Sequence, residues 1–350
     1  MRENDYRDFS LKTHRKNWSL ERPNVCRFEL TFACGLHCTH CYSDCYNSRE
    51  NIRKELDTKE AKLIVDKIYD SGVIWLCLTG GDPLTRADFL EIYNYAKEKG
   101  FIISIFTNGY SMTEETIAYF KNSPPFAVEL TLNAATAETY EKISQVKGSF
   151  EKTMQGIKLM LEAHLPLKIK TQATKQNIQE MAQIKRLIED FGLPFHPGFD
   201  LHPRLNGDNT PCAFRVEPDD VLHSSDMPKI NLPPKPQRNG DLLFRCAAAD
   251  GDIHIDPYGN MFLCNLIREP AYNLLEVDIE YARSRILSLV RGRRFISASK
   301  CKNCFLREFC SWCPGRARLE MGDEETAIAY YCRLAESIYN GTLQNAGESR

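Results

Sequence analysis

The chain has 350 residues, which is enough for two or three compact units of ordinary size. Its 45 basic and 47 acidic residues give a formal net charge of −2, which excludes a global positive field for nucleic acid or an anionic membrane. No apolar run approaches the ~20 residues that span a bilayer, and the amino terminus lacks the apolar core of a signal peptide. We therefore expect a cytoplasmic protein with neither nucleic acid nor membrane as a partner.

Cysteine is abundant, with 14 residues in the chain. Reducing compartments keep thiols free, so these cysteines are hard to interpret as disulfides. Their number favours metal-binding or catalytic roles. Cys26 and Cys77 lie within apolar strand-like runs and are expected to be small buried side chains.

Six β/α units are predicted between residues 25 and 202. The strand-like runs are 27–32, 74–79, 101–107, 126–132, 166–172 and 193–201. Helical periodicity is clearest in 58–72, 86–100 and 178–192, each of which ends in glycine. Units in this order imply parallel strands joined by helical crossovers. The pattern alone leaves open a doubly wound sheet or a complete or partial barrel.

Composition divides the chain into five segments. Residues 1–23 form an amino-terminal extension, and 24–202 contain the β/α units. The proline-rich, polar residues 203–240 are predicted to be a connecting arm. Cysteines are dense in residues 241–340, and 341–350 are predicted to be a frayed tail.

Three cysteines, Cys34, Cys38 and Cys41, follow the first strand in the spacing C-x3-C-x2-C. Three thiolates on a 4Fe-4S cluster would leave one iron with an open position. Zinc is an alternative, because His37 and His40 are local and three cysteines with one histidine form a common zinc site. Cys45 is an extra thiol nearby, and could be a fourth ligand.

This spacing after a first strand resembles the signature of radical S-adenosylmethionine (SAM) enzymes. The resemblance implies a partial (β/α)6 TIM-like barrel in which the amino and carboxylate groups of SAM bind the unique iron. An electron from the cluster then cleaves SAM to a 5′-deoxyadenosyl radical. His40 stands where the family usually has an aromatic residue that packs near the adenine.

Further strand-end residues are similar to the SAM contacts of the family. Gly80, Gly81 and Asp82 resemble the GGE segment that binds the methionine amino group, with Asp82 in place of Glu. Asn108 lies in "FTNGY" after the third strand, and Asn133 ends the fourth, where capping of the strand end is an equal alternative. Lys142 and Lys147 are not in register for the carboxylate contact that relatives make with arginine.

A second set of cysteines follows the arm. A zinc ribbon is the simpler interpretation of Cys301-x2-Cys304 and Cys310-x2-Cys313. With Cys246, Cys264 and Cys332, however, the region is similar to the SPASM domain, which holds two auxiliary 4Fe-4S clusters. The resemblance implies an outer cluster on Cys301, Cys304, Cys310 and Cys332.

The inner cluster would lie on Cys246, Cys264 and Cys313, with its fourth iron open or bound by Cys212 or a nearby Asp. Three 4Fe-4S clusters and SAM are therefore the expected cofactors. Trp312 stands between two of these cysteines and is expected to shield a cluster from water.

Auxiliary clusters can accept an electron from a substrate radical, which favours net oxidation. SPASM relatives mostly act on peptides and proteins, so we expect a peptide or protein maturase with a reductant such as flavodoxin or ferredoxin. Cys34 lies so early that a leader-binding domain does not fit before it, which implies a separate recognition protein or a leaderless mode.

Three alternatives stay open. One is a small-molecule or tetrapyrrole enzyme of the same family. A sulfatase-type maturase is another, although Asn265 stands where such enzymes have an Asp base. The third is a metal-binding redox sensor without catalytic activity.

Overall fold

The computed structural model describes residues 3–223, 241–244 and 251–347. Its strands are β1 (Val25–Thr31), β2 (Trp75–Gly80), β3 (Ile102–Thr107), β4 (Ala127–Thr131), β5 (Leu167–Gln172), β6 (His196–Gly198), β7 (Asp252–Ile255), β8 (Asn260–Phe262) and β9 (Tyr272–Asn273). Its helices are α1 (Glu3–Ser19), α2 (Arg49–Ile52), α3 (Thr58–Asp70), α4 (Phe89–Glu98), α5 (Glu114–Asn122), α6 (Ala137–Ser144), α7 (Ser149–Glu162), α8 (Met181–Asp190), α9 (Pro218–His223), α11 (Ile279–Val290), α12 (Pro314–Met321) and α13 (Ala329–Gly347). Short 3-10 turns are η1 (Asp44–Tyr46), η2 (Pro83–Thr85), η3 (Ile178–Glu180), η4 (Thr210–Phe214) and η5 (Phe305–Phe309).

The described strands form one open sheet in the order β6-β5-β4-β3-β2-β1-β7-β8-β9. β1 to β6 are parallel neighbours in chain order, which confirms the six predicted β/α units and the partial barrel. β7 pairs with β1 in parallel, and β8 and β9 continue the sheet in antiparallel pairs. The predicted connecting arm therefore lies between β6 and β7 in the chain. β7 pairs with the edge of β1 that faces away from β2.

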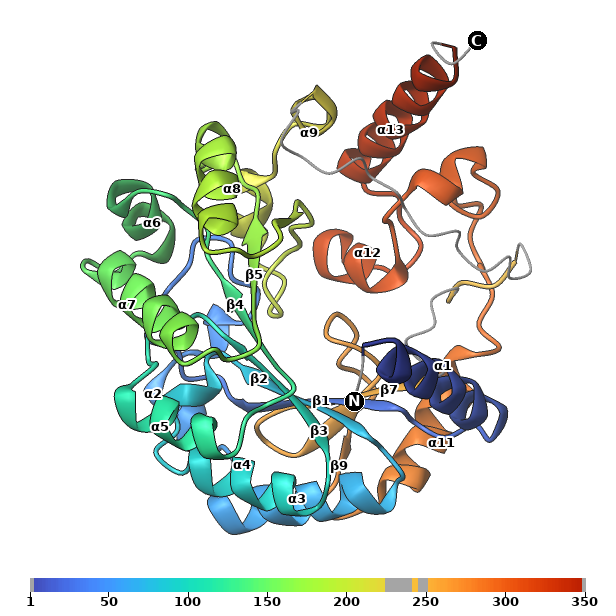
Figure 1. Ribbon diagram of the computed structural model, residues 1–350. Coiled ribbons are helices and arrows are strands. Elements are labelled where there is room, and N and C mark those ends of the chain that lie inside the picture. Colours follow the sequence, from blue (N-terminus) through green and yellow to red (C-terminus); the bar gives the residue numbers. More distant parts are fainter. Residues whose placement is uncertain (1–2, 224–240, 245–250, 348–350) are drawn as a thin grey trace.

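Helix α3 illustrates why the predicted helices form. Asp57 and Glu60 make a capping box at its amino end, and Gly72, two residues after the helix, has φ +85°. Its buried residues, Ala61, Ile64, Val65 and Ile68, recur at three-to-four spacing. They pack in the main core with alternate residues of β1 and β2, so the helices cover the outer face of the curved sheet (Figure 1).

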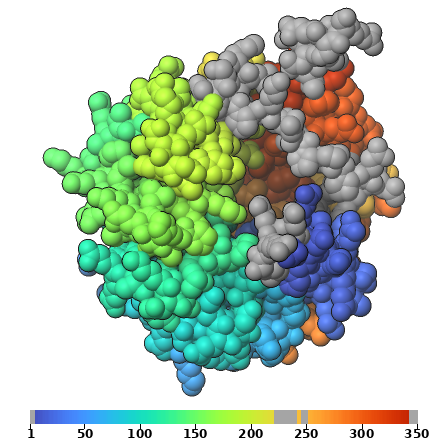
Figure 2. Space-filling model, viewed as in Figure 1, coloured from blue at the N-terminus to red at the C-terminus, as the bar shows by residue number. Residues whose placement is uncertain are grey.

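The inner face of the sheet carries the other set of alternate residues. Three ion pairs between oppositely charged side chains involve this face: Arg27 with Asp252, Glu29 with Arg268 and Glu129 with Lys170. Cys26 is fully buried and Cys77 is 6% exposed, which confirms the interpretation of both as buried thiols. Figure 2 shows a hollow between the yellow-green segment around α8 and the orange-red C-terminal segment.

The two ends of the chain add helices to this framework. Helix α1 lies in the predicted extension and packs on Trp75 of β2, whose Nε1–H donates to the Tyr6 hydroxyl over 2.9 Å. Helix α13 runs to Gly347, within the segment predicted as a tail. Its residues form a second, smaller core with Ala317 of α12 and with Ile328. Within the described residues, no helix is both long enough and apolar enough to cross a bilayer.

Candidate active site

The three closely spaced cysteines lie in an irregular loop at the carboxyl end of β1. Asn47 holds the start of this loop, because its Oδ1 accepts from the Cys34 N–H at 3.3 Å. Its Nδ2 donates to the carbonyl oxygens of Cys34 and Leu36 at 3.1 and 3.4 Å. One side chain thus fixes the backbone on both sides of the first thiol.

The middle of the loop caps helix α6. The backbone N–H groups of His37 and Thr39 donate to the carbonyl oxygens of Ser144 and Ile143, each over 2.9 Å. The last carbonyls of a helix have no hydrogen-bond partner within the helix. These two hydrogen bonds therefore satisfy both the carbonyl groups of α6 and the N–H groups of the loop. The second cysteine, Cys38, is held between these two anchored residues.

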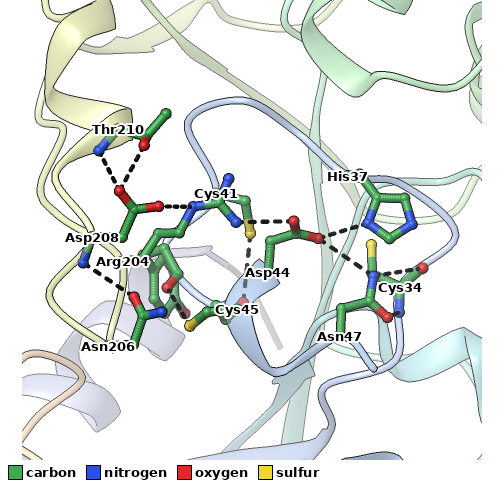
Figure 3. A network of polar contacts seen from close by, with 12 residues as sticks. Cys34, His37, Cys41, Asp44, Cys45, Asn47, Arg204, Asn206, Asp208 and Thr210 are labelled. Atoms are coloured by element: carbon green, nitrogen blue, oxygen red, sulfur yellow. Dashed lines mark hydrogen bonds and ion pairs between the residues drawn. The ribbon is translucent and has the colours of Figure 1, made fainter. Parts of the chain in front are cut away.

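The end of the loop is tied to the predicted arm, as Figure 3 shows. Asp44 lies 2.9 Å from His37 Nδ1 and accepts from Arg204 Nη1 at 3.0 Å. Arg204 also reaches Asp208 at 3.3 Å, and the Leu205 N–H donates to the Tyr42 carbonyl over 2.9 Å. The arm is therefore part of the site, which its proline-rich composition did not indicate.

The three thiols are partly buried and close enough to affect one another. Burial, followed by the negative charge of Asp82, raises the pKa of Cys34 to about 12. Burial raises the pKa of Cys38 well above its usual value, and Cys41 and Cys34 add to that shift. Without a cation these thiols stay protonated, whereas a bound metal favours the thiolate. Three soft sulfur donors at one strand end fit an iron–sulfur cluster.

The ligands of a single metal ion stand closer together than the ligands of an iron–sulfur cluster. Across the described ranges, no three side chains of His, Cys, Asp or Glu form a group that could hold a single metal ion. In a 4Fe-4S cluster each thiolate binds a different iron, so its ligands stand further apart than those of a zinc ion.

Gly80 and Gly81 lie directly against the backbone that leads into the cysteine loop. A Cβ on Gly80, which has φ +143°, would stand 2.1 Å from the Thr31 carbonyl oxygen. A Cβ on Gly81 would stand 2.5 Å from the carbonyl oxygens of Phe32 and Ala33. These glycines therefore permit the close approach of two strand ends.

Asp82 is fully buried and joins the ends of β2 and β3. Its carboxylate accepts from the Thr107 hydroxyl at 2.8 and 3.0 Å, from the Asn108 N–H at 3.0 Å and from the Leu84 N–H at 3.0 Å. Burial raises its pKa to about 6, although these hydrogen bonds oppose the shift. Both carboxylate oxygens are thus engaged within the protein.

Asn108 connects this pair of strand ends to the first thiol. Its Nδ2 donates to Cys34 Sγ over 3.3 Å, and its Oδ1 accepts from the Tyr110 N–H at 2.8 Å. Donation to the sulfur would stabilise a thiolate. The structure brings Asn108 together with the cysteine loop, as the sequence predicted.

His40 and Asn133 meet on the other side of the loop. Asn133 is 5% exposed at the end of β4, and its Nδ2 lies 3.3 Å from His40 Nε2. Burial lowers the pKa of His40 to about 4, so the imidazole is neutral near pH 7. Lys142 and Lys147 are exposed.

The second set of cysteines gathers around the carboxyl-terminal helices. Burial and the neighbouring thiols of Cys332, Cys310 and Cys304 raise the pKa of Cys301 to about 11. These four are the set that the resemblance implied for the outer cluster. Trp312 lies beside them, because its backbone N–H donates to Cys310 Sγ over 3.4 Å. Its indole ring stacks on the ring of Phe295.

The cysteines implied for the inner cluster are only partly described. Cys264 forms an isolated β-bridge with Ile267, and Cys313 is the N-cap residue directly before helix α12. Cys246 lies outside the described residues. Cys212 stands in η4, where burial raises the pKa of its thiol and the charges of Arg215, Glu320 and Asp208 also act on it.

Sequence reasoning missed three side chains that hold the cysteine loop: Asn47, Asp44 and Arg204. Asp44 and Asn47 follow the cysteines closely, and a polar residue after a metal motif is a weak signal for such a role. Arg204 carries no signal, because it is 160 residues from Asp44 in the chain.

Comparisons with known proteins agree with this geometry. A family model described as the radical SAM superfamily matches residues 28–190. An AdoMet-dependent heme synthase of Methanosarcina barkeri is 26% identical over 340 residues, covering 88% of this chain and 97% of that protein. The mycofactocin maturase MftC of Mycolicibacterium smegmatis is 30% identical over 264 residues, covering 70% of this chain and 65% of that protein. This chain thus spans less than two thirds of the maturase's length.

A solved structure shows the same fold. Streptococcus suis SuiB bound to precursor peptide SuiA superposes with a TM-score of 0.68 at 15% identity, covering 91% of this chain and 79% of that chain. The segment that matches the family model contains the whole cysteine loop and the strand ends that hold it. We conclude that residues 28–190 match the radical SAM superfamily and that the chain shares the fold of SuiB.

Proposed function

We propose that this enzyme cleaves SAM reductively and oxidises a peptide or protein substrate. The superfamily uses a 4Fe-4S cluster and SAM, and the observation that carries the proposal is the site at the end of β1. Three thiols there stand beside Asp82, Asn108 and the His40–Asn133 pair, on the ends of neighbouring strands. A redox sensor would not need this arrangement, and the relatives are enzymes.

Cys34, Cys38 and Cys41 would hold the cluster and leave one iron for SAM. When bound, the cluster supplies the electron that splits SAM into methionine and a 5′-deoxyadenosyl radical, which abstracts a hydrogen atom from the substrate. Asn108 stabilises the Cys34 thiolate by donating to its sulfur. Asp82 fixes the β2 and β3 loops against each other. The protein thus supplies placement rather than the reactivity itself.

The C-terminal cysteines support net oxidation. Cys301, Cys304, Cys310 and Cys332 stand together, and we propose that they bind an outer auxiliary cluster. Cys246, Cys264 and Cys313 would bind an inner one. Such clusters would accept the electron that a substrate radical loses. A reductant such as flavodoxin or ferredoxin, a separate leader-recognition protein and a cytoplasmic location complete the proposal.

The charges of the inner sheet face support a peptide substrate. Three of its cations, Arg27, Arg268 and Lys170, are paired with carboxylates, and Lys168 on the same face is exposed. A substrate with several carboxylates would have to displace these partners, whereas a peptide backbone is neutral and can hydrogen-bond to them. MftC is named a maturase, and SuiB was crystallised with a precursor peptide.

A tetrapyrrole substrate is the second candidate. The alignment with the Methanosarcina barkeri heme synthase covers 88% of this chain and 97% of that protein. The two candidates share the SAM site and differ in the substrate alone, so the substrate assay decides between them.

The first experiment measures iron, sulfide and zinc after anaerobic reconstitution. We expect about twelve irons per chain with equal sulfide, because three cubane clusters hold four irons each. The triple variant Cys34→Ala, Cys38→Ala, Cys41→Ala should keep about eight irons and lose SAM cleavage. About four irons together with zinc in the wild type would overturn the auxiliary clusters and the oxidative reaction.

The second experiment tests the substrate. The reconstituted enzyme is incubated with reductant, SAM and either small peptides encoded beside its gene or a carboxylate-bearing iron tetrapyrrole. We expect a peptide product that has lost two hydrogen atoms, detected by mass spectrometry. Conversion of the tetrapyrrole alone would replace the peptide proposal by the second candidate.

A further inference from the structure

Arg268 joins the strand that leads to the cysteine loop with the turn that carries Cys264. Its guanidinium donates to both oxygens of the Glu29 carboxylate, from Nη1 over 2.9 Å and from Nη2 over 2.8 Å. Its Nε donates to the Asn265 carbonyl oxygen over 3.3 Å. Glu29 lies on β1, and Asn265 directly follows Cys264 in the chain. One side chain therefore connects β1 to the backbone beside a predicted cluster ligand.

The Arg268 guanidinium is held firmly in this position. The side chains of Arg268 and Glu29 are only 17% and 3% exposed. The guanidinium carbon lies 4.5 Å from the centroid of the Phe262 ring and 5.7 Å from that of the Phe32 ring. A forked contact with a carboxylate fixes the direction of both groups, and the aromatic rings limit the movement of the cation further. Arg268 can thus determine where the turn lies relative to β1.

The turn itself is closed by two backbone hydrogen bonds. The Ile267 N–H donates to the Cys264 carbonyl oxygen over 2.9 Å, and the Cys264 N–H donates to the Ile267 carbonyl oxygen over 3.4 Å. Arg268 directly follows this turn in the chain. A movement of the Arg268 backbone would therefore move Cys264 with it.

Helix α12 packs on the same turn. A Cβ on Gly315 would stand 2.8 Å from Ile267 Cγ1 and 2.9 Å from Leu266 Cβ, so any side chain at this position would push the turn away. Gly315 lies in the first turn of α12, and Cys313 is the N-cap residue of that helix. The fold thus brings the elements that carry the two described cysteines of the implied inner cluster into direct contact, which fits a shared cluster.

We propose that Arg268 is a positioning residue for the inner auxiliary cluster, because it clamps the turn to Glu29 and so holds Cys264 near Cys313. The inference rests on the proposed auxiliary clusters and adds a residue that acts on one of them. Arg268 acts through the backbone of the turn, since its guanidinium is engaged by Glu29 and Asn265. Because Glu29 lies on β1, the same clamp fixes the inner cluster relative to the strand that leads to the first cluster.

The test is made in the triple variant that lacks the thiols of the cysteine loop, which should hold about eight irons in two auxiliary clusters. Arg268→Met removes the clamp but leaves the buried Glu29 charge without its partner, which can unfold the protein. The double variant Glu29→Met, Arg268→Met removes the clamp without leaving a buried charge unpaired.

Arg86→Met, in the same triple-variant background, is the matched control. Arg86 also pairs with a carboxylate, that of Asp88, and their side chains are 11% and 22% exposed. It also donates to backbone carbonyl oxygens, those of Leu30 and Leu56, which belong to the barrel rather than to the turn.

The measurements are iron and sulfide per chain, the EPR spectrum of the reduced protein and thermal unfolding by circular dichroism. We expect about four irons in Arg268→Met and in the double variant, with the EPR signal of one cluster lost, because the outer cluster does not depend on the clamp. Arg86→Met should keep about eight irons. The double variant should unfold in one transition.

About eight irons in the double variant would overturn the inference. Loss of the same iron in Arg86→Met would also overturn it, because the iron content would then follow general stability. Unfolding of the double variant, or loss of all its iron, would contradict it too, since the clamp would then support the whole C-terminal region rather than one cluster. If Arg268→Met alone unfolds, the double variant decides.

The failure of this inference can be told apart from the failure of the proposed function. A triple variant without iron defeats the auxiliary clusters and this inference together. A wild type that holds about twelve irons but modifies no peptide defeats only the proposed substrate, and the clamp is then judged by the iron content of the variants.

Discussion

At the scale of one residue, the contacts of Asp82 in the fold differ from the SAM contact that its motif predicted. The sequence marks it as a short substitute for a glutamate that would bind SAM. In the fold it is fully buried and accepts hydrogen bonds from Thr107, Asn108 and Leu84. We expect its main contribution to be the geometry of the β2 and β3 loops.

This burial makes the stability of the protein depend on pH. The folded pKa of Asp82 is about 6, above its ordinary value of 3.8, so the folded state binds the proton more tightly than the unfolded state. The associated stability is present below pH 4 and is lost as the pH rises through 6. Two pKa units correspond to about 3 kcal/mol.

Urea unfolding of the cluster-free wild type and of Asp82→Asn, compared between pH 4 and pH 7, tests this prediction. The wild type should lose about 2 kcal/mol relative to the variant over that range, because part of the effect is already lost at pH 4. A difference between the two proteins that stays constant with pH would contradict the assignment.

At the scale of elements, the arm and the cysteine loop form one unit. Arg204 and Asp44 join them at 3.0 Å, with side chains only 17% and 14% exposed. Breaking a buried pair leaves one charge without its partner. The arm therefore contributes to the site even though it supplies none of the predicted ligands of the first cluster.

A double-mutant cycle measures this contact. Arg204→Met and Asp44→Asn should each destabilise the protein by about 2–4 kcal/mol, and the double variant by clearly less than the sum. Lys54→Met, at an exposed pair with Glu50, should cost less than about 1 kcal/mol. Additive effects in urea unfolding would show that the two side chains do not interact.

At the scale of the whole molecule, the C-terminal region completes the sheet. β7 pairs with β1 from Val25↔Asp252 to Phe28↔Ile255, so the strand that leads to the cysteine loop is internal. A chain cut before β7 would expose that edge, and unpaired edges promote aggregation.

We expect a chain of residues 1–240 to aggregate or to unfold without a cooperative transition. A chain of residues 1–340 keeps β7 to β9 and should unfold in one transition. Gel filtration and thermal circular dichroism check both. A soluble, cooperative 1–240 chain would show that the barrel folds independently of β7.

The sequence alone determined the β/α architecture of this protein and predicted a cluster site on three cysteines after its first strand. Helix and strand periodicity are local, and Cys34, Cys38 and Cys41 are neighbours in the chain, so both could be recognised without a structure. The predicted strand-end residues Asp82, Asn108 and Asn133 also lie beside the cysteine loop.

Only the tertiary structure decided what these residues contact. In the fold, the Asp82 carboxylate accepts hydrogen bonds from Thr107, and Asn133 lies between Gln172 and His40. Arg204 pairs with Asp44, and β7 pairs with β1. Each of these contacts joins residues that are distant in the chain. Local periodicity and spacing carry no information about such partners, because they arise when the edges and ends of separate elements pack together.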